Sequence, residues 1–117
     1  MDLSNGKVNF KVNTKKYNKL VRDKIPQIIK ASDNECEIVI VSGDEKYDFL
    51  ENKLMEEVNE YIEDKNVEEL SDIMEVIFGL AHELGYSEEQ LMDIRRKKME
   101  ERGGFKEGIV LKSVKYV

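Results

Sequence analysis

Acidic side chains are concentrated in two short stretches near the middle of the chain, EEVNE at 56–60 and ELSD at 69–72. Because residues three apart on an α-helix share a face, each stretch offers a pair of neighbouring carboxylates. The pairs are Glu57 with Glu60 and Glu69 with Asp72. Hard divalent cations such as Mg2+ bind carboxylate oxygens and bridge them to substrate phosphates. The two pairs are therefore candidate metal ligands.

The connection between the two stretches favours their convergence. A turn at residues 64–66 is short enough to force the flanking helices antiparallel. With a rise of about 1.5 Å per residue, Glu60 lies at the same height above this turn as Glu69, and Glu57 at the same height as Asp72. Carboxylates in a helix–helix interface are costly unless a cation neutralises them. We expect four carboxylates to meet at one cation-sized site.

A solvated helix face is the alternative interpretation of these residues. Acidic side chains are abundant in this sequence, and carboxylates three apart occur on many exposed helices. Glu69 and Asp72 also lie near the start of a predicted helix, where capping and the helix dipole favour acidic residues. The coincidence of two pairs across one tight turn favours the metal site.

Basic residues near both ends of the chain could bind phosphate oxygens. On the last predicted helix, Lys98 and Arg102 continue a row that begins with apolar residues, so we expect them to point inward. Lys19 and Arg22 form a second candidate pair. Arginine can contact phosphate bidentately and lysine acts as a point charge. The alternative for Lys98 and Arg102 is a simple response to the helix dipole.

Hydrophobic periodicity predicts a mainly α fold with four helices. The first starts or bends near Pro26, the second covers about Glu45–Asp64, the third starts after the N-cap Asn66 and runs to Leu84, and the fourth follows the Ser87 cap and runs to about Arg102. The third helix is apolar over most of its circumference, so we expect it to be central. Alternating or β-branched segments at 7–13, 38–41 and 109–117 predict a small peripheral β element.

Length and composition bound the remaining possibilities. The 117 residues fit one domain, 1–117, in which residues 1–16 are an N-terminal extension that could form a strand. A net charge of −6 argues against nucleic acid and anionic membrane surfaces as partners. Cys36 is the only cysteine, and no signal sequence or membrane-spanning run is present, which predicts a cytoplasmic protein. The modest core favours a homo-oligomer, a dimer or tetramer.

Motifs in the order EExxE and ExxD resemble the metal motif of the MazG-like all-α nucleoside triphosphate pyrophosphohydrolases, a superfamily that includes phosphoribosyl-ATP pyrophosphohydrolase. The stretches YNKLVRDKIP at 17–26 and RGGF at 102–105 are similar to the signature ends of its house-cleaning subgroup. The resemblance covers about residues 17–111. It implies a four-helix MazG-like bundle and a phosphate-containing nucleotide as substrate.

The resemblance also implies a role for each site residue. Glu57, Glu60, Glu69 and Asp72 would bind Mg2+, or alternatively Mn2+, Glu56 would be an accessory carboxylate near the attacking water, and Lys98 and Arg102 would contact phosphates. The expected reaction is hydrolysis of a nucleoside triphosphate to the monophosphate and pyrophosphate, possible substrates including modified nucleotides. The alternatives are phosphoribosyl-ATP hydrolysis in histidine synthesis and a non-catalytic helical interaction module.

Overall fold

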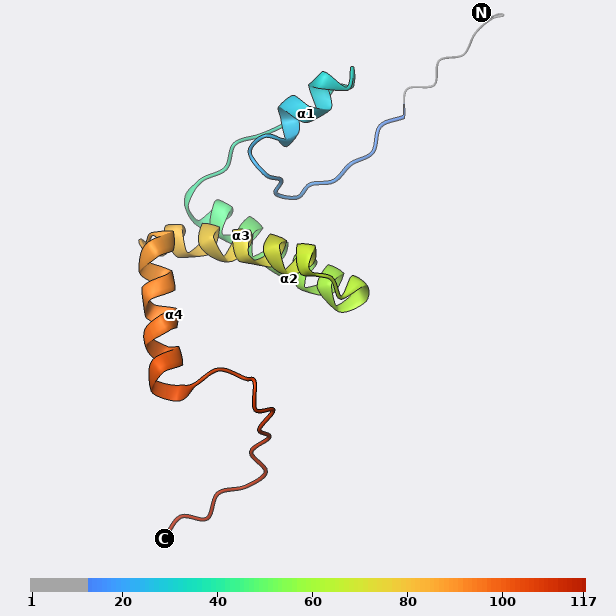
Figure 1. Cartoon of the computed structure of the whole chain (residues 1–117). Coiled ribbons are helices and arrows are strands. Elements are labelled where there is room, and N and C mark those ends of the chain that lie inside the picture. Colours follow the sequence, from blue (N-terminus) through green and yellow to red (C-terminus); the bar gives the residue numbers. More distant parts are fainter. Residues whose placement is uncertain (1–12) are drawn as a thin grey trace, which may run out of the picture.

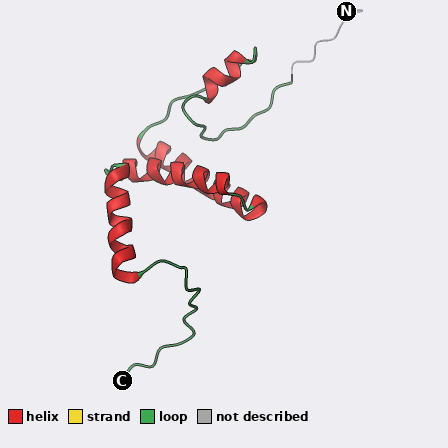
Figure 2. Ribbon diagram, viewed as in Figure 1, coloured by secondary structure: helices red, strands yellow, loops and turns green. Residues whose placement is uncertain are grey.

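The computed structural model describes residues 13–117, and all regular secondary structure in this range is helical (Figures 1 and 2). The helices are α1 (Ile25–Ala31), α2 (Gly43–Asp64), α3 (Val67–Glu83) and α4 (Glu88–Arg102). The predicted mainly α class is confirmed, and the helix boundaries agree with the sequence pattern to within about two residues. None of the described helices is long and apolar enough to cross a membrane.

A tight turn folds α2 and α3 into an antiparallel hairpin, which forms the body of the protein (Figure 1). Lys65 ends α2 in the left-handed conformation, with a φ of 51°, and its N–H donates to Tyr61 O over 2.7 Å. The next residue, Asn66, caps α3 because its side-chain oxygen accepts a hydrogen bond of 3.0 Å from the Glu69 N–H. Two adjacent residues therefore end one helix and start the next, which fixes the register of the hairpin.

The apolar core of the hairpin is small. Leu50 of α2, together with Val76 and Ala81 of α3, are the fully buried apolar residues among those described. Gly79 lets the helices approach closely, since a Cβ at this position would lie 2.9 Å from Leu50 Cδ2. The absence of a side chain at Gly79 therefore makes room for Leu50, close to the end of the hairpin opposite the turn.

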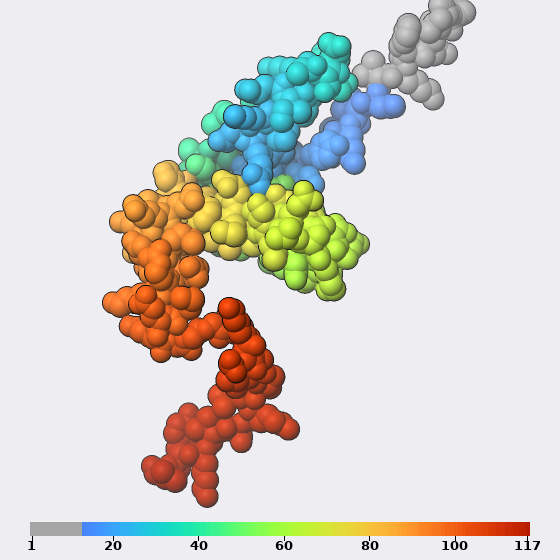
Figure 3. Space-filling model, viewed as in Figure 1, coloured from blue at the N-terminus to red at the C-terminus, as the bar shows by residue number. Residues whose placement is uncertain are grey.

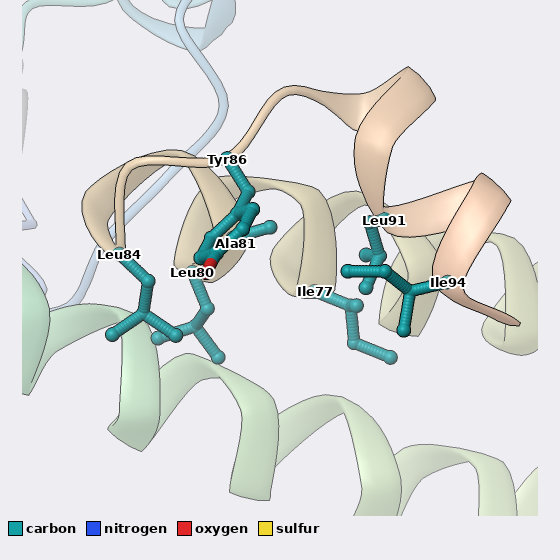
Figure 4. Close-up of a pocket in the computed structure, with 7 residues that line it drawn as sticks. All are labelled: Ile77, Leu80, Ala81, Leu84, Tyr86, Leu91 and Ile94. Carbon is teal, nitrogen blue, oxygen red and sulfur yellow. The ribbon is translucent and has the colours of Figure 1, made fainter.

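Helix α4 packs against the C-terminal half of α3 and does not contact α2. The predicted capping box is confirmed, because the Ser87 side chain accepts from the Gln90 N–H and the Gln90 side chain accepts from the Ser87 N–H. An apolar groove of about 410 Å³ lies between α3 and α4 (Figure 4). Its lining residues are Ile77, Leu80, Ala81, Leu84, Tyr86, Leu91 and Ile94.

The chain is open rather than compact (Figure 3). Its radius of gyration is 21.8 Å, whereas a compact domain of this length would have about 13 Å. Helix α1 packs against none of the other helices. Within one chain the four helices therefore do not close into the expected bundle. Helix α3 contacts both α2 and α4, as a central helix should, but Leu70 and Met74 on its surface remain exposed.

The predicted β element is wrong for the described residues. Segments 38–41 and 109–117 are extended but form no strand, and residues 7–12 of the third candidate lie outside the range that the structure describes. An isolated strand leaves its backbone groups without partners, and neither segment has a neighbouring strand to pair with. β-branched residues such as Val39 and Ile40 therefore remain exposed in a connecting segment.

The Asn66 cap generates a stability prediction. Asn66→Ala should lower the free energy of unfolding by about 1 kcal/mol, because the Glu69 N–H loses its acceptor at the start of α3. Urea unfolding followed by circular dichroism, at one fixed protein concentration, measures the change. Asn52→Ala, at an exposed position inside α2, is the matched control and should be neutral or slightly stabilising. Equal effects of the two substitutions would contradict the role of the cap.

Candidate functional site

Five carboxylates gather on the hairpin in two overlapping groups. Glu56, Glu57 and Glu60 of α2 form one group, and Glu57 joins Glu69 and Asp72 of α3 in the other. Within each group, one carboxylate oxygen from every residue lies within 4.8 Å of the others. Three of the four carboxylates expected to meet across the turn, those of Glu57, Glu69 and Asp72, therefore form one group, whereas Glu60 lies in the other group and Glu57 belongs to both. We call these five residues the carboxylate cluster.

Glu57 is the most deeply placed member of the carboxylate cluster. Only 6% of its surface is exposed, and among the described residues it is the one fully buried polar residue. Its Oε1 is inaccessible to solvent and has no hydrogen-bond partner in the described structure. A buried, unpartnered carboxylate oxygen carries a large desolvation cost unless a cation offsets it. A merely solvated helix face does not account for this position.

A lysine that the sequence analysis missed lies inside the cluster. Lys53 Nζ lies 3.1 Å from Glu56 Oε2 and 3.2 Å from Glu57 Oε2, and only 17% of its side chain is exposed. Burial alone would lower the pKa of Lys53, but the hydrogen bonds that Lys53 donates to Glu56 and Glu57, together with their negative charges, outweigh it and raise the pKa. The signal was available, since Lys53 precedes these residues by three and four positions on the same helix.

The segment before α1 brings both of its candidate cations to the cluster. Lys19 Nζ lies 3.2 Å from Glu56 Oε2, and Arg22 Nη2 lies 2.7 Å from Asp72 Oδ1. Both basic side chains are substantially exposed, so they cover the rim of the site rather than its interior. Lys19 and Arg22 are therefore close enough to the cluster to contact a ligand bound there.

Lys98 and Arg102 lie elsewhere in the chain. Both are exposed on α4, which packs on the far half of α3 and runs away from the hairpin (Figure 1). Of the row of residues expected to point inward, Leu91 and Ile94 face α3. Lys98 and Arg102 lie further along α4, beyond its contact with α3. Within one chain these two cations do not join the carboxylate cluster.

The protonation of the cluster is uneven. Burial, a hydrogen bond to Asp64 and the charge of Glu60 raise the pKa of Glu69 to about 7. Burial and the charges of Glu57 and Glu56 also raise the pKa of Glu60. For Glu56, burial acts in the same direction, but the hydrogen bonds from Lys53 and Lys19 outweigh it and lower the pKa. Without a further cation, the cluster therefore resists full ionisation at neutral pH.

The donor set fits a hard divalent cation. All five residues offer carboxylate oxygens, the ligands typical of Mg2+ and Mn2+ sites, and none is a histidine or cysteine. The Oε1 of Glu57 supplies a buried oxygen without a hydrogen-bond partner, which a bound cation would satisfy. The carboxylate cluster could therefore bind a metal ion.

No protein-family model, curated protein or solved structure matches the chain. The functional argument therefore depends on the residues and geometry of this chain.

The raised pKa of Glu69 generates a prediction about pH. Between 4.5 and about 7 the folded protein holds a proton on Glu69 that the unfolded chain releases, so this contribution to stability is full below 4.5 and is lost as the pH rises through 7. The metal-free protein should therefore melt at a higher temperature near pH 5 than near pH 8. The lowered pKa of Glu56 acts in the opposite direction, but only below 4.5.

Thermal melts in the presence of EDTA test this dependence. Glu69→Gln should flatten the profile over this window, whereas Glu68→Gln, at an exposed neighbour, should leave it unchanged. A wild-type melting temperature that is lower at pH 5 than at pH 8 would contradict the assignment. The same dependence of melting temperature on pH in both variants would also contradict it.

Proposed function

We propose that this chain is a Mg2+-dependent nucleoside triphosphate pyrophosphohydrolase, with Mn2+ as the alternative ion, that releases a nucleoside monophosphate and pyrophosphate. The observation that carries the proposal is the buried, unpartnered Oε1 of Glu57 at the junction of two carboxylate groups. The order of the motifs EExxE, ExxD and RGGF, which resembles MazG-like pyrophosphohydrolases, supports the choice of reaction.

The proposed metal ligands are Glu57, Glu60, Glu69 and Asp72, which α2 and α3 hold on facing surfaces. When bound there, Mg2+ would neutralise the triphosphate and make water a stronger acid. Burial of Glu57 fixes the interior end of the ligand set. Glu60, Glu69 and Asp72 are only half-buried, so the opposite side of the cluster is open to an incoming polyphosphate.

Glu56 is the proposed acceptor of the proton from the attacking water. Lys19 and Lys53 both bond to its Oε2, which leaves Oε1 to accept the proton. The same two lysines lower the pKa of Glu56 against the effect of burial, so the carboxylate is ionised at neutral pH, as a general base must be. The attack is directed at the α-phosphorus, and pyrophosphate leaves.

Lys19 and Arg22 are the proposed phosphate contacts contributed by the same chain. Their side chains reach Glu56 and Asp72 at the rim, where phosphate oxygens of a bound substrate would lie. Arg22 in particular can exchange a carboxylate for a phosphate without changing its hydrogen-bonding geometry. Positive charge at this rim would stabilise negative charge that develops on the leaving pyrophosphate.

We further propose that the active protein is a homo-oligomer, a dimer or tetramer. A core of Leu50, Val76 and Ala81 is small for a chain of 117 residues. Exposed apolar side chains on α3, such as Leu70 and Met74, provide surface that a second copy would bury. In such an assembly Lys98 and Arg102 would reach the carboxylate cluster of a neighbouring copy.

Pyrophosphate release over a panel of nucleoside triphosphates, modified nucleotides and phosphoribosyl-ATP tests the reaction. Asp72→Asn and Glu60→Gln should each lower kcat/KM by about 100-fold or more, because loss of a metal ligand should exceed the 10- to 100-fold cost of losing an outer-shell partner. Glu75→Gln, at an exposed position on α3, should retain wild-type activity.

The panel also separates the alternatives. Turnover of phosphoribosyl-ATP alone would assign the chain to histidine synthesis instead. If no nucleotide releases pyrophosphate and Mg2+ leaves the melting temperature unchanged, the interaction module would replace the enzyme, because a ligand of the native state must stabilise it.

The placement of Lys98 and Arg102 generates a mixing prediction. Lys98→Met or Arg102→Met should lower kcat/KM by roughly 10- to 100-fold, the loss of about 1.5–3 kcal/mol for a charge-assisted contact. If these cations act on a neighbouring copy, an equal mixture of Arg102→Met and Asp72→Asn subunits should regain activity after the subunits exchange. In a dimer about half of the molecules would then be heterodimers, and one of the two sites in each heterodimer would be intact, so about a quarter of the wild-type activity should return.

Mixing Asp72→Asn with Glu60→Gln is the matched control. Both substitutions affect the same carboxylate cluster, so heterodimers contain no intact site and activity should not recover. Light scattering on the same preparations gives the oligomeric state. Recovery in neither mixture would show that Arg102 does not act across subunits, and a monomeric mass would rule out the assembly.

A further inference from the structure

The carboxylate cluster is unequally supplied with cations from its own chain. In the group of Glu56, Glu57 and Glu60, Lys53 bridges two of the three carboxylates. In the group of Glu57, Glu69 and Asp72, Lys53 contacts Glu57. The one other ion pair of this group among the described residues joins Arg22 to Asp72. Among the described residues, the group on α2 therefore contains a buried cation, and the group between α2 and α3 does not.

The two carboxylate oxygens of Glu57, the residue common to both groups, have different surroundings. Its Oε2 receives Lys53 Nζ at 3.2 Å, whereas its Oε1 is buried without a hydrogen-bond partner. The carboxylate is more than nine-tenths buried, so water does not satisfy Oε1. One oxygen of this carboxylate thus contacts the Lys53 ammonium group, and the other has no partner among the described residues, so a bound cation would offset its desolvation.

Charge balance leads to the same division. Among residues 13–117, the five carboxylates of the cluster pair with three cationic side chains, Lys19, Lys53 and Arg22. Two negative charges therefore remain when all five carboxylates are ionised, and one divalent cation balances them. A second divalent cation on the side of Glu56 and Glu57 would compete with Lys53 for the same two carboxylates.

Lys53 is well suited to stay in place. It bonds to residues three and four positions ahead on its own helix, so the rigid backbone of α2 sets the geometry of both contacts. Its side chain is mostly buried, and removing the ammonium group would leave Glu57 without an ion pair among the described residues, while Glu56 would keep only the exposed Lys19. Lys53 holds one oxygen of Glu57, the residue common to both groups, so its ammonium group lies where a second metal ion would need the same carboxylates.

We propose that Lys53 takes the place of a second metal ion, so that the carboxylate cluster binds one divalent cation per chain, held by Glu57, Glu69 and Asp72 with Glu60 at its edge. This inference rests on the proposed function. Lys53 is a positioning residue in this arrangement, since it orients Glu56 and Glu57 and does not touch the substrate. The site is thus a single-ion site with a permanent cation beside it.

Counting bound Mn2+ tests this inference. Free Mn2+ measured by electron paramagnetic resonance during titration gives the number of ions per chain without any turnover. Wild-type protein should bind one Mn2+ per chain. Lys53→Met, which keeps the bulk and removes the charge, should bind two, and Lys53→Arg, which can still bridge Glu56 and Glu57, should bind one.

Lys46→Met is the matched control. Lys46 lies on the same helix and pairs with Glu83 at 2.9 Å, outside the carboxylate cluster. Its loss changes the net charge of the protein equally, so this variant should bind one Mn2+ per chain. A second ion in Lys46→Met would attribute the effect to overall charge and overturn the role of Lys53.

The outcomes distinguish this inference from the proposed function. Two ions in the wild-type protein would overturn the role of Lys53 and leave the metal-dependent reaction standing. One ion in both wild-type and a folded Lys53→Met protein would do the same. No ion in the wild-type protein would remove both proposals. If Lys53→Met does not fold, the wild-type count decides, because two ions are incompatible with Lys53 in its observed place.

Discussion

The burial of the Glu57 carboxylate is the constraint on which the rest of the site depends. A carboxylate at a helix–helix interface loses its hydration and must recover that free energy from cations or hydrogen bonds. Lys53 supplies one such contact, at Oε2, and Oε1 receives none within the described structure. The neighbouring carboxylates make the local potential more negative and raise the pKa of Glu69 and Glu60, after the larger effect of burial. The chain therefore carries a local electrostatic cost in a place where a divalent cation would remove it.

The turn between α2 and α3 converts this local cost into a defined geometry. Lys65 and Asn66 end one helix and start the next without an intervening loop residue. Since each residue rotates an α-helix by about 100°, one additional residue within α3 ahead of Glu69 would turn the side chains of Glu69 and Asp72 away from Glu57. The close approach at Gly79 holds the other end of the hairpin. Backbone conformation at one end and small side chains at the other thus place the five carboxylates together.

Features of the fold that depend on local sequence could be predicted, and features that depend on distant contacts could not. The caps at Asn66 and Ser87 depend on residues three positions apart, and the approach of the acidic pairs depends on one short turn between two adjacent helices. Whether a segment such as 38–41 forms a strand cannot be predicted from its own residues, because a strand requires a partner from elsewhere in the chain. The role of Lys53 could have been predicted, because Lys53 lies three and four positions before Glu56 and Glu57 on the same helix. The prediction of the site considered the acidic residues of this helix and not its lysine. The position of Lys98 depends on the direction in which α4 leaves α3, and the residue pattern within α4 does not predict that direction.

The open shape of the chain links its stability to its site. Helix α4 contacts only the far half of α3, so it leaves apolar surface on the hairpin uncovered and carries Lys98 and Arg102 away from the carboxylates. Both consequences have one physical origin, because a chain whose helices do not close on each other can bury its surface only against another copy or another partner. A surface that covers α3 would approach the hairpin that holds the carboxylate cluster. Assembly and completion of the site would then be the same event, since the contacts that bury the apolar face also determine which cations reach the phosphates.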